Sequence, residues 1–447
     1  VLEDSSLSVQ YSINAGNGGH ISLTDSNAML GDLGIRESSV FQQTGGTTVI
    51  TDRIEMTREN ENTPTASITG GALQVTGDHG NIYAGTFAAT DSDMSFVNLH
   101  TSYDGTVLQI DGGSLSFADE MTVSDGASAW LTGSSDDKLL VRRGDGGLNR
   151  GGLYIVSGAS LTMENVDYSI SGGDHNSIYL QGASLTVTDS QLSAGSYNLE
   201  GPDTNLQFVG SSIAGKWITF RGIEANSTDS TFVPEEEMGV FDNSILTFTG
   251  QNTIQGPGSF ALAATVIVGS IDELQFHPTA AVAADRLDVT CGNAFINGTV
   301  IAGHNGQVAF GNETPASHWY TENDASLQLH EDGKFIFGGE TGLPSLARVE
   351  LMDTPWACSP VELIGTVYGN YDTLTMDEEG PRFLVRGGSL IDGTIDCPVD
   401  AVMFVFDKYV RPDGNYARIT NVQFNSLVDA YGSLDIDNSC GSSTTHC

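Results

Sequence analysis

The sequence predicts an all-β fold in which the chain winds as a parallel β-helix, or β-solenoid. Three observations predict it. A short phrase of the form small-Ser-Leu-polar-apolar returns about every two dozen residues, residues typical of turns lie between its copies, and no run of ten or more residues has a helical period with capping residues.

The repeated phrase reads as a short strand. Two of its spacings are single steps, 24 residues from Leu161 to Leu185 and 21 residues from Leu185 to Leu206, and the others are close to double steps. The copies are Ala72-Leu73-Gln74-Val75, Gly113-Ser114-Leu115-Ser116-Phe117, Ala159-Ser160-Leu161-Thr162-Met163, Ala183-Ser184-Leu185-Thr186-Val187, Asn205-Leu206-Gln207-Phe208, Ser244-Ile245-Leu246-Thr247-Phe248 and Ala325-Ser326-Leu327-Gln328-Leu329.

Within each phrase apolar and polar residues alternate, so a strand would place the leucine and the second apolar residue on one face. The Gly, Asp, Asn and Ser clusters between phrases supply positive φ or bond their own backbone in turns. A repeat of this length that lacks helices predicts coils of roughly 20 to 25 residues, whose strands stack at about 4.8 Å.

The pattern divides the chain into three parts. Residues 1–65 are less regular and are expected to form a cap or irregular first coils, and residues 66–310 hold the regular coils. Residues 311–447 are richer in aromatic residues and contain all the cysteines but one. We expect this part to form elaborated coils or a cap, because an open solenoid end is an unpaired edge.

Composition limits the partners and the location. The 57 acidic and 17 basic residues give a net charge of −40, which disfavours nucleic acid and anionic membrane surfaces. The longest apolar stretch, Phe260 to Ile271, is too short to cross a bilayer, so no membrane insertion is expected. The chain opens at Val1 without the features of a signal peptide, which predicts an extracellular or cell-surface protein after removal of an export signal.

The five cysteines lie in the last third of the chain and lack the spacing of a metal site. Cys440 and Cys447 are candidates for a small disulfide loop, and Cys358 and Cys397 for a bridge across neighbouring coils. Cys291 is left over, and it is either a buried thiol or a covalent link between subunits.

Part of the sequence resembles a known group of proteins. The run Phe41-Gln42-Gln43-Thr44-Gly45-Gly46-Thr47-Thr48-Val49, followed by Ala66-Ser67-Ile68-Thr69-Gly70-Gly71-Ala72-Leu73-Gln74-Val75, is similar to repeats of secreted bacterial β-helix proteins of the autotransporter-passenger and pectin-lyase-like type. The resemblance implies export and a right-handed β-helix. It implies no single activity, since that group includes adhesins, fibre proteins, polysaccharide lyases and hydrolases, and phage tailspikes.

No catalytic constellation stands out in the sequence. The Gly-x-Ser phrases lack the closing glycine of a nucleophile elbow, and no phosphate-binding glycine loop occurs. The best lyase-like group is Lys138, Arg142, Arg143 and Arg150, which a charged loop explains as well. Acidic pairs suited to glycoside hydrolysis are expected by chance among 57 acidic residues, so no catalytic residue is assigned.

No cofactor is required, and calcium is the candidate ligand. Acidic turns stacked on successive coils would bring carboxylates within about 5 Å, where a bridging cation would relieve their repulsion. The candidate calcium ligands are three pairs: Asp91 and Asp93, Asp392 and Asp396, and Asp435 and Asp437.

These features favour an extracellular structural protein, either a self-assembling fibre or matrix subunit or an adhesin stalk. Its expected partners are other copies of itself and cell-surface or matrix polysaccharide. The alternative is a polysaccharide lyase or glycoside hydrolase of the pectin-lyase-like fold, and a third reading is a glycan-binding, tailspike-like protein.

Overall fold

The computed structural model shows a chain made of strands that divides into two compact units, Val1–Ile218 and Thr219–Cys447. The structure describes the backbone of residues 1–58, 62–143, 152–170, 177–268, 285–296, 298–303 and 306–310, and of the strands that follow. Side chains are described for residues 1–58, 62–142, 152–170, 178–268, 285–289, 298–303 and 306–309. No helix among these residues is long and apolar enough to span a membrane.

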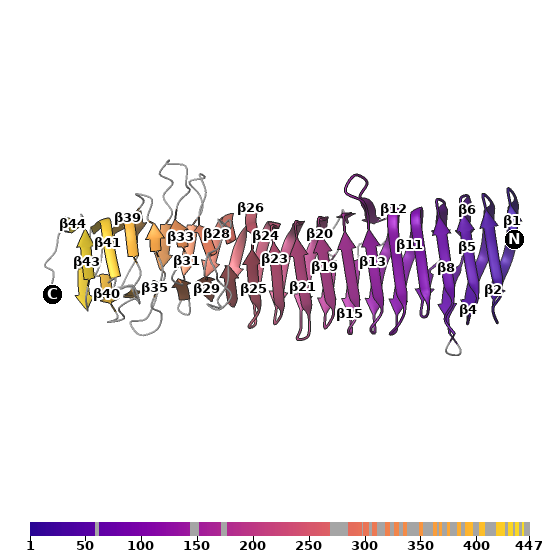
Figure 1. The fold of residues 1–447 in the computed structure, drawn as a ribbon, viewed down its shortest axis with the longest axis horizontal. Helices are drawn as coiled ribbons and strands as arrows, with labels where there is room; N and C mark the ends of the chain where they lie inside the picture. Colours follow the sequence, from indigo (N-terminus) through magenta and orange to yellow (C-terminus); the bar gives the residue numbers. More distant parts are fainter. Residues whose placement is uncertain are drawn as a thin grey trace, which may run out of the picture. The chain divides into compact units, whose positions relative to one another are not determined.

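In the N-terminal unit each coil contributes a strand to each of three faces. Figure 1 shows strands of successive coils side by side along this unit. The first face is built from β1 (Leu2–Glu3), β3 (His20–Thr24), β5 (Val40–Thr44), β8 (Thr65–Thr69), the starts of β11 (Thr86–Ser102) and β12 (Val107–Ser124), β13 (Ser128–Thr132), β16 (Ser160–Glu164), β19 (Ser184–Thr188) and β21 (Asn205–Val209).

The second face is built from the starts of β2 (Ser6–Ala15) and β4 (Asn27–Arg36), β6 (Thr47–Ile50), β9 (Ala72–Val75), the middles of β11 and β12, β14 (Leu139–Arg143), β17 (Val166–Ser169), the start of β20 (Gln191–Glu200) and β22 (Ser212–Arg221), which crosses into the next unit. The third face is built from the ends of β2, β4, β11, β12 and β20, together with β7 (Arg53–Thr57), β10 (His79–Ile82), β15 (Gly152–Val156) and β18 (Ser177–Gln181).

The C-terminal unit repeats the parallel pairing, as in β23 with β25 and β39 with β41. Its first strands are β23 (Glu224–Thr228), β24 (Thr231–Phe241), β25 (Ile245–Thr249), β26 (Gln251–Leu262), β27 (Thr265–Val268), β28 (Asp285–Ile296), β29 (Thr299–Ala302) and β30 (Gly306–Phe310). The later strands are β31 (His318–Thr321), β32 (Ser326–Leu329), β33 (Lys334–Phe337), β34 (Arg348–Leu351), β35 (Val361–Leu363), β36 (Thr366–Tyr368), β37 (Thr373–Thr375), β38 (Arg382–Val385), β39 (Ser389–Asp396), β40 (Val402–Phe406), β41 (Ala417–Phe424), β42 (Val428–Tyr431), β43 (Leu434–Asp437) and β44 (Cys440–Gly441).

The core of the N-terminal unit consists of ladders of inward side chains at paired positions on successive coils. On the first face one ladder runs Phe41, Ala66, Phe87, Leu108, Ala129, Leu161, Leu185 and Leu206, and each member is at most 2% exposed. Ala66 and Ala129 stand among the larger side chains, which lets the phenylalanine rings fill a thin core without overpacking. The predicted parallel β-helix is therefore confirmed.

The repeated leucines do not share one ladder. Leu73 and Leu115 lie on the second face, whereas Leu161, Leu185 and Leu206 lie on the first. Leu115 pairs with Val141, not with Leu161. The 46-residue step in the sequence therefore includes a change of face as well as a change of coil.

A left-handed turn residue stands at the corner between the first and second faces. In the N-terminal unit this corner holds Asp4, Asp25, Gly45, Gly70, Asp91, Gly112, Asn165, Asp189 and Gly210, with φ between 45° and 72°. Their backbone N–H groups bond the coil that follows, as Asp25 N–H does to Thr44 O at 2.8 Å and Gly45 N–H to Thr69 O at 2.8 Å. The corner is therefore hydrogen-bonded from coil to coil like the strands beside it.

Aspartate and glycine complement each other at this corner. The Asp25 carboxylate lies where a Cβ on Gly45 would stand, and Asp91 Oδ1 is 2.6 Å from the corresponding position on Gly112. The same relation joins Asp189 with Gly210 in this unit. A carboxylate on one coil thus covers a glycine on the next, where any side chain would collide with it.

Serines that follow the left-handed residue satisfy buried turn amides. Ser190 Oγ donates to Thr188 O at 2.6 Å and accepts from Val166 N–H of the preceding coil at 2.9 Å. Ser211 Oγ repeats this, donating to Val209 O at 2.7 Å and accepting from Ser190 N–H at 3.2 Å. These hydroxyls are almost fully buried, so each satisfies a donor that water does not reach.

Among the inward positions of the N-terminal unit, Gln43, Thr48 and Thr101 are polar and fully buried. Gln43 stands between Leu23 and Ile68 in a core ladder and is fully buried. Its Nε2 donates to Gly45 O at 3.2 Å and to Ala72 O at 3.1 Å, across two coils. On the preceding coil this corner is Asp25-Ser26, and the Ser26 hydroxyl donates to a turn carbonyl. Where Gly45-Gly46 replaces that pair, the Gln43 amide is the donor to a turn carbonyl instead.

We expect Gly46→Ala to destabilise the N-terminal unit more than Gly70→Ala does. Both glycines have φ near +60°, which costs an alanine about 1 kcal/mol. A Cβ on Gly46 would also overlap the Ser26 carbonyl, adding about 1 to 3 kcal/mol, whereas a Cβ on Gly70 meets nothing within 4 Å. Denaturant unfolding measures both, and equal losses would contradict the close stacking of this corner.

We expect Ser190→Ala to lower the free energy of unfolding by about 1 to 3 kcal/mol, because it leaves the buried Val166 N–H without an acceptor. Ser193→Ala is the matched control, since Ser193 is exposed on the neighbouring strand. Its expected effect is within about 0.5 kcal/mol. A Ser190 variant as stable as this control would show that the hydroxyl is dispensable.

Candidate functional site: the third face of the N-terminal unit

The outward side chains of the third face differ from those of the first. On the first face they are mostly short or amide side chains, as in Ser67, Gln109 and Thr162. On the third face one outward column, here called the third-face column, carries larger groups with several hydrogen-bonding atoms. It runs through consecutive coils in the order Glu55, Asn81, His100, Thr122, Tyr154, Tyr179 and Asn198.

The alternation of each strand fixes the direction of these side chains. His100 lies between the buried Leu99 and Thr101, and Tyr179 between the buried Ile178 and Leu180. Each member of the third-face column is half-buried. The inward neighbours anchor the strand, so the column holds its outward side chains on a rigid support.

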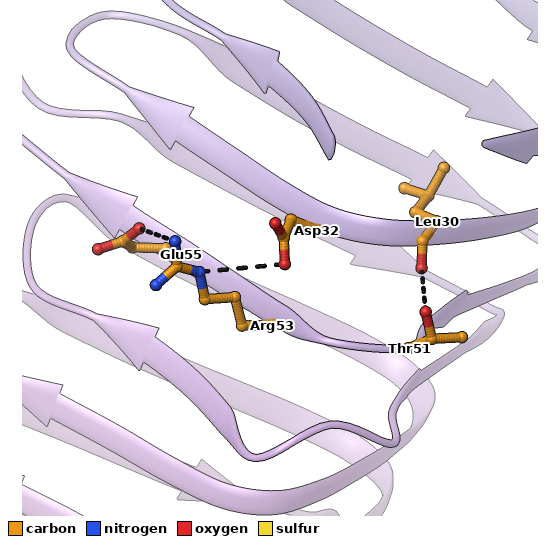
Figure 2. Close-up of polar contacts among 5 residues, drawn as sticks. All are labelled: Leu30, Asp32, Thr51, Arg53 and Glu55. Atoms are coloured by element: carbon orange, nitrogen blue, oxygen red, sulfur yellow. Dashed lines mark hydrogen bonds and ion pairs between the residues drawn. The ribbon is translucent and has the colours of Figure 1, made fainter. Parts of the chain in front are cut away.

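The first coils of this face carry a cluster of charges. Arg53 Nε lies 4.0 Å from Asp32 Oδ1, and an Arg53 terminal nitrogen lies 4.0 Å from Glu55 Oε2 (Figure 2). The turn that places them is held by Thr51 Oγ1, which donates to Leu30 O at 3.2 Å. The arginine side chain is 53% exposed and both contacts are long, so these ion pairs add little stability.

Asp52 lies close enough to Asp32 to influence the ionisation of Asp32. Partial burial raises the pKa of Asp32, and the charge of Asp52 and a hydrogen bond with its carboxyl raise it further, while Arg53 opposes the shift.

Two histidines and a glutamate lie at the centre of the face. The rings of His79 and His100 meet edge to face, with centroids 5.9 Å apart. His100 Nε2 lies 3.0 Å from Glu120 Oε1, which becomes an ion pair when the imidazole is protonated. No group of three or more His, Cys, Asp or Glu side chains suited to a metal occurs among the described residues.

Tyrosines complete the face. Tyr154 and Tyr179 are neighbours in the third-face column, with ring centroids 6.2 Å apart. Tyr179 donates its hydroxyl to Glu200 Oε1 at 2.6 Å, and this bond is the main reason that its pKa rises to about 12. At the end of the face Tyr83 and Tyr103 meet at 5.8 Å, and Tyr103 is 54% exposed.

The structure places one predicted calcium pair within its described side chains. Asp91 stands at the turn against Gly112, and Asp93 accepts a hydrogen bond from Ser114 Oγ at 2.7 Å. The expected stacking of carboxylates on neighbouring coils does not occur at Asp91, because its corner neighbours are Gly70 and Gly112. Calcium binding at this pair stays a prediction.

The other predicted site residues lie beyond the described side chains. The backbone places Asp392 and Asp396 in β39, Asp435 and Asp437 in β43, Cys291 in β28 and Cys440 in β44. Cys358, Cys397 and Cys447 lie outside the described residues, so the disulfide assignments stay predictions.

The sequence analysis missed the third-face column. Its seven members lie in different stretches of the sequence that share no common motif. Their common feature is the coil register, which puts Tyr154 beside Tyr179 and Asn81 beside His100. A search of outward positions could have found them only after the strands had been assigned to faces.

Comparison with known proteins identifies no relative that would assign a role to this face. No protein-family model matches the chain, and no curated protein matches it. The chemistry of the exposed side chains therefore carries the functional argument.

We expect Asp32→Asn to raise the free energy of unfolding at pH 7. Because the pKa of Asp32 is raised in the folded protein, the native state binds more protons than the unfolded state just above pH 3.8, so stability from this group falls as pH rises through that window. The gain from the substitution should vanish below pH 3.8.

Thermal unfolding at pH 7 and at a pH below 3.8 measures this difference. Asp136→Asn, at an exposed turn, is the control. A gain that is the same at both pH values, or a loss at pH 7, would contradict the Asp32–Asp52 interaction.

Proposed function

We propose that this chain is an extracellular structural protein, a stiff β-solenoid that serves as a stalk or as the subunit of a self-assembling fibre or matrix. The single observation that carries the proposal is the coil-to-coil hydrogen bonding of the N-terminal unit, which runs through three faces and through the corner between two of them. Export to the cell surface fits the resemblance and the acidic composition.

Stiffness follows from this arrangement. Bending a stack of coils lengthens the hydrogen bonds on one face and compresses the side-chain ladders on the opposite side. Because the strands and the corner residues are all bonded between coils, no coil in the unit can tilt without straining several bonds at once. A stalk or fibre needs this property, and a binding module with a single site does not.

The first coil provides a surface for association. Among the described strands β1 pairs with β3 and β2 with β4, so each keeps one unpaired edge. Leu7, Val9 and Ile13 occupy inward positions there yet are only half-buried. A further coil stacked on this edge would bury these side chains, and in the proposed assembly a second copy of the chain supplies that coil.

Electron microscopy of the purified chain, in calcium, in chelator and with reductant, tests the proposal. We expect rods that join end to end. Loss of joining in chelator would assign the contact to cations, and loss in reductant would assign it to a thiol such as Cys291. Single particles under every condition would contradict assembly.

A paired substitution locates the contact. Val9→Asp places a charge at the open inward position and should abolish joining, whereas Ser8→Asp places the same charge on the outer side of β2 and should leave joining intact. Circular dichroism confirms that both variants fold. Joining that survives Val9→Asp would place the contact elsewhere.

A further inference from the structure

We propose that the third-face column of the N-terminal unit binds an uncharged, linear polysaccharide laid along the direction in which the coils stack. The proposal rests on the extracellular setting of the proposed function and names the ligand class of the surface described above. It does not require the chain to assemble.

The side chains of the column are those that bind sugar hydroxyls and sugar rings. Asn81 and Asn198 offer amide donors and acceptors, and Glu55 offers acceptors. His100 can offer only Nδ1, because its Nε2 is buried beside Glu120. Tyr154 and Tyr179 add aromatic surface suited to the apolar C–H faces of a pyranose. The corresponding column of the first face runs Ser67, Ala88, Gln109, Trp130 and Thr162, and it holds a single aromatic residue and no histidine or charged side chain.

The charge of the face selects against anionic polymers. Asp32, Asp52, Glu55, Glu120 and Glu200 lie on or beside it, and Arg53 is already placed between two carboxylates. A polyuronate or sulfated chain would meet repulsion along its whole length. An uncharged polysaccharide avoids that cost and can bond the polar atoms of the face that are not already paired within the protein.

The spacing of the column suits a repeating ligand. Column residues occupy paired positions on successive coils, so they recur at about 4.8 Å, a step comparable with one sugar unit of an extended chain. A peptide strand has no place here, because β10, β15 and β18 are paired on both edges. The ligand must be read through side chains, as a polysaccharide is.

Binding to soluble uncharged polysaccharides tests the proposal, with the full chain measured by affinity electrophoresis against a β-glucan, a mannan and an arabinoxylan. Polygalacturonate is the anionic comparison. We expect at least one uncharged polymer to bind, polygalacturonate not to bind, and the double variant Tyr154→Ala with Tyr179→Ala to weaken binding about tenfold or more.

Trp130→Ala is the matched control, because Trp130 is an outward aromatic residue, 38% exposed, on the first face of the same unit. It should leave binding unchanged. Should the tyrosine variant unfold, His100→Ala and Asn198→Ala provide the same test on other coils. Each should weaken binding by a smaller factor.

Three results would overturn the proposal: no uncharged polymer binds, polygalacturonate binds better than the uncharged polymers, or binding is lost in Trp130→Ala and kept in the column variants. Rods that join end to end without binding any polysaccharide would reject this inference and leave the proposed function standing. Polysaccharide binding by single particles that never join would reject the proposed assembly and leave this inference standing.

Discussion

Hydrogen bonds that join each coil to the next are the interaction on which the rest of the N-terminal unit depends. They are formed by strands on three faces and by the corner residues that connect the first face to the second. On most coils of the unit the corner places a left-handed residue against one on the next coil, which keeps the two coils in register there. The core ladders are a consequence, since paired backbones put side chains at corresponding positions above one another.

The corner shows how a repeat can tolerate variation in sequence. An Asp-Ser pair and a Gly-Gly pair both fit, because aspartate and glycine reach a positive φ more readily than other residues do. Ser26 and Ser92 satisfy turn carbonyls with hydroxyls, and at the Gly45-Gly46 corner Gln43 supplies the missing donor from inside the core. The residues at the corner therefore change from coil to coil, while the hydrogen-bond pattern is kept.

The outward positions are not subject to the constraints that act on the inward and corner residues. Inward residues and corner residues are constrained by packing and by φ, whereas an outward residue needs only to tolerate a strand. The concentration of histidine, tyrosine and amide side chains on the third face is consequently not a requirement of folding. The first face forms with mainly Ser, Thr and Gln at outward positions such as Ser67, Gln109 and Thr162, so the strands of the third face do not require Tyr154 or His100, which favours a binding role.

The parallel β-helix could be predicted because its two requirements are local. Alternation within phrases such as Ala183 to Val187 and turn residues such as Asp189 are visible within a few positions of one another. The assignment of strands to faces was beyond sequence reasoning, because Leu115 and Leu161 carry the same phrase on different faces. The third-face column depends on that assignment, and so the candidate site emerged only from the register.

The coil register of the N-terminal unit is the central claim, and disulfide formation between paired cysteine substitutions tests it most directly. Gln109 and Trp130 are outward partners on adjacent first-face strands, whereas Gln109 and Ser128 are displaced by two residues. Our account predicts that Gln109→Cys with Trp130→Cys forms a crosslink under mild oxidation, mapped by mass spectrometry, and that Gln109→Cys with Ser128→Cys does not. Crosslinking of the displaced pair alone would contradict the register and everything derived from it.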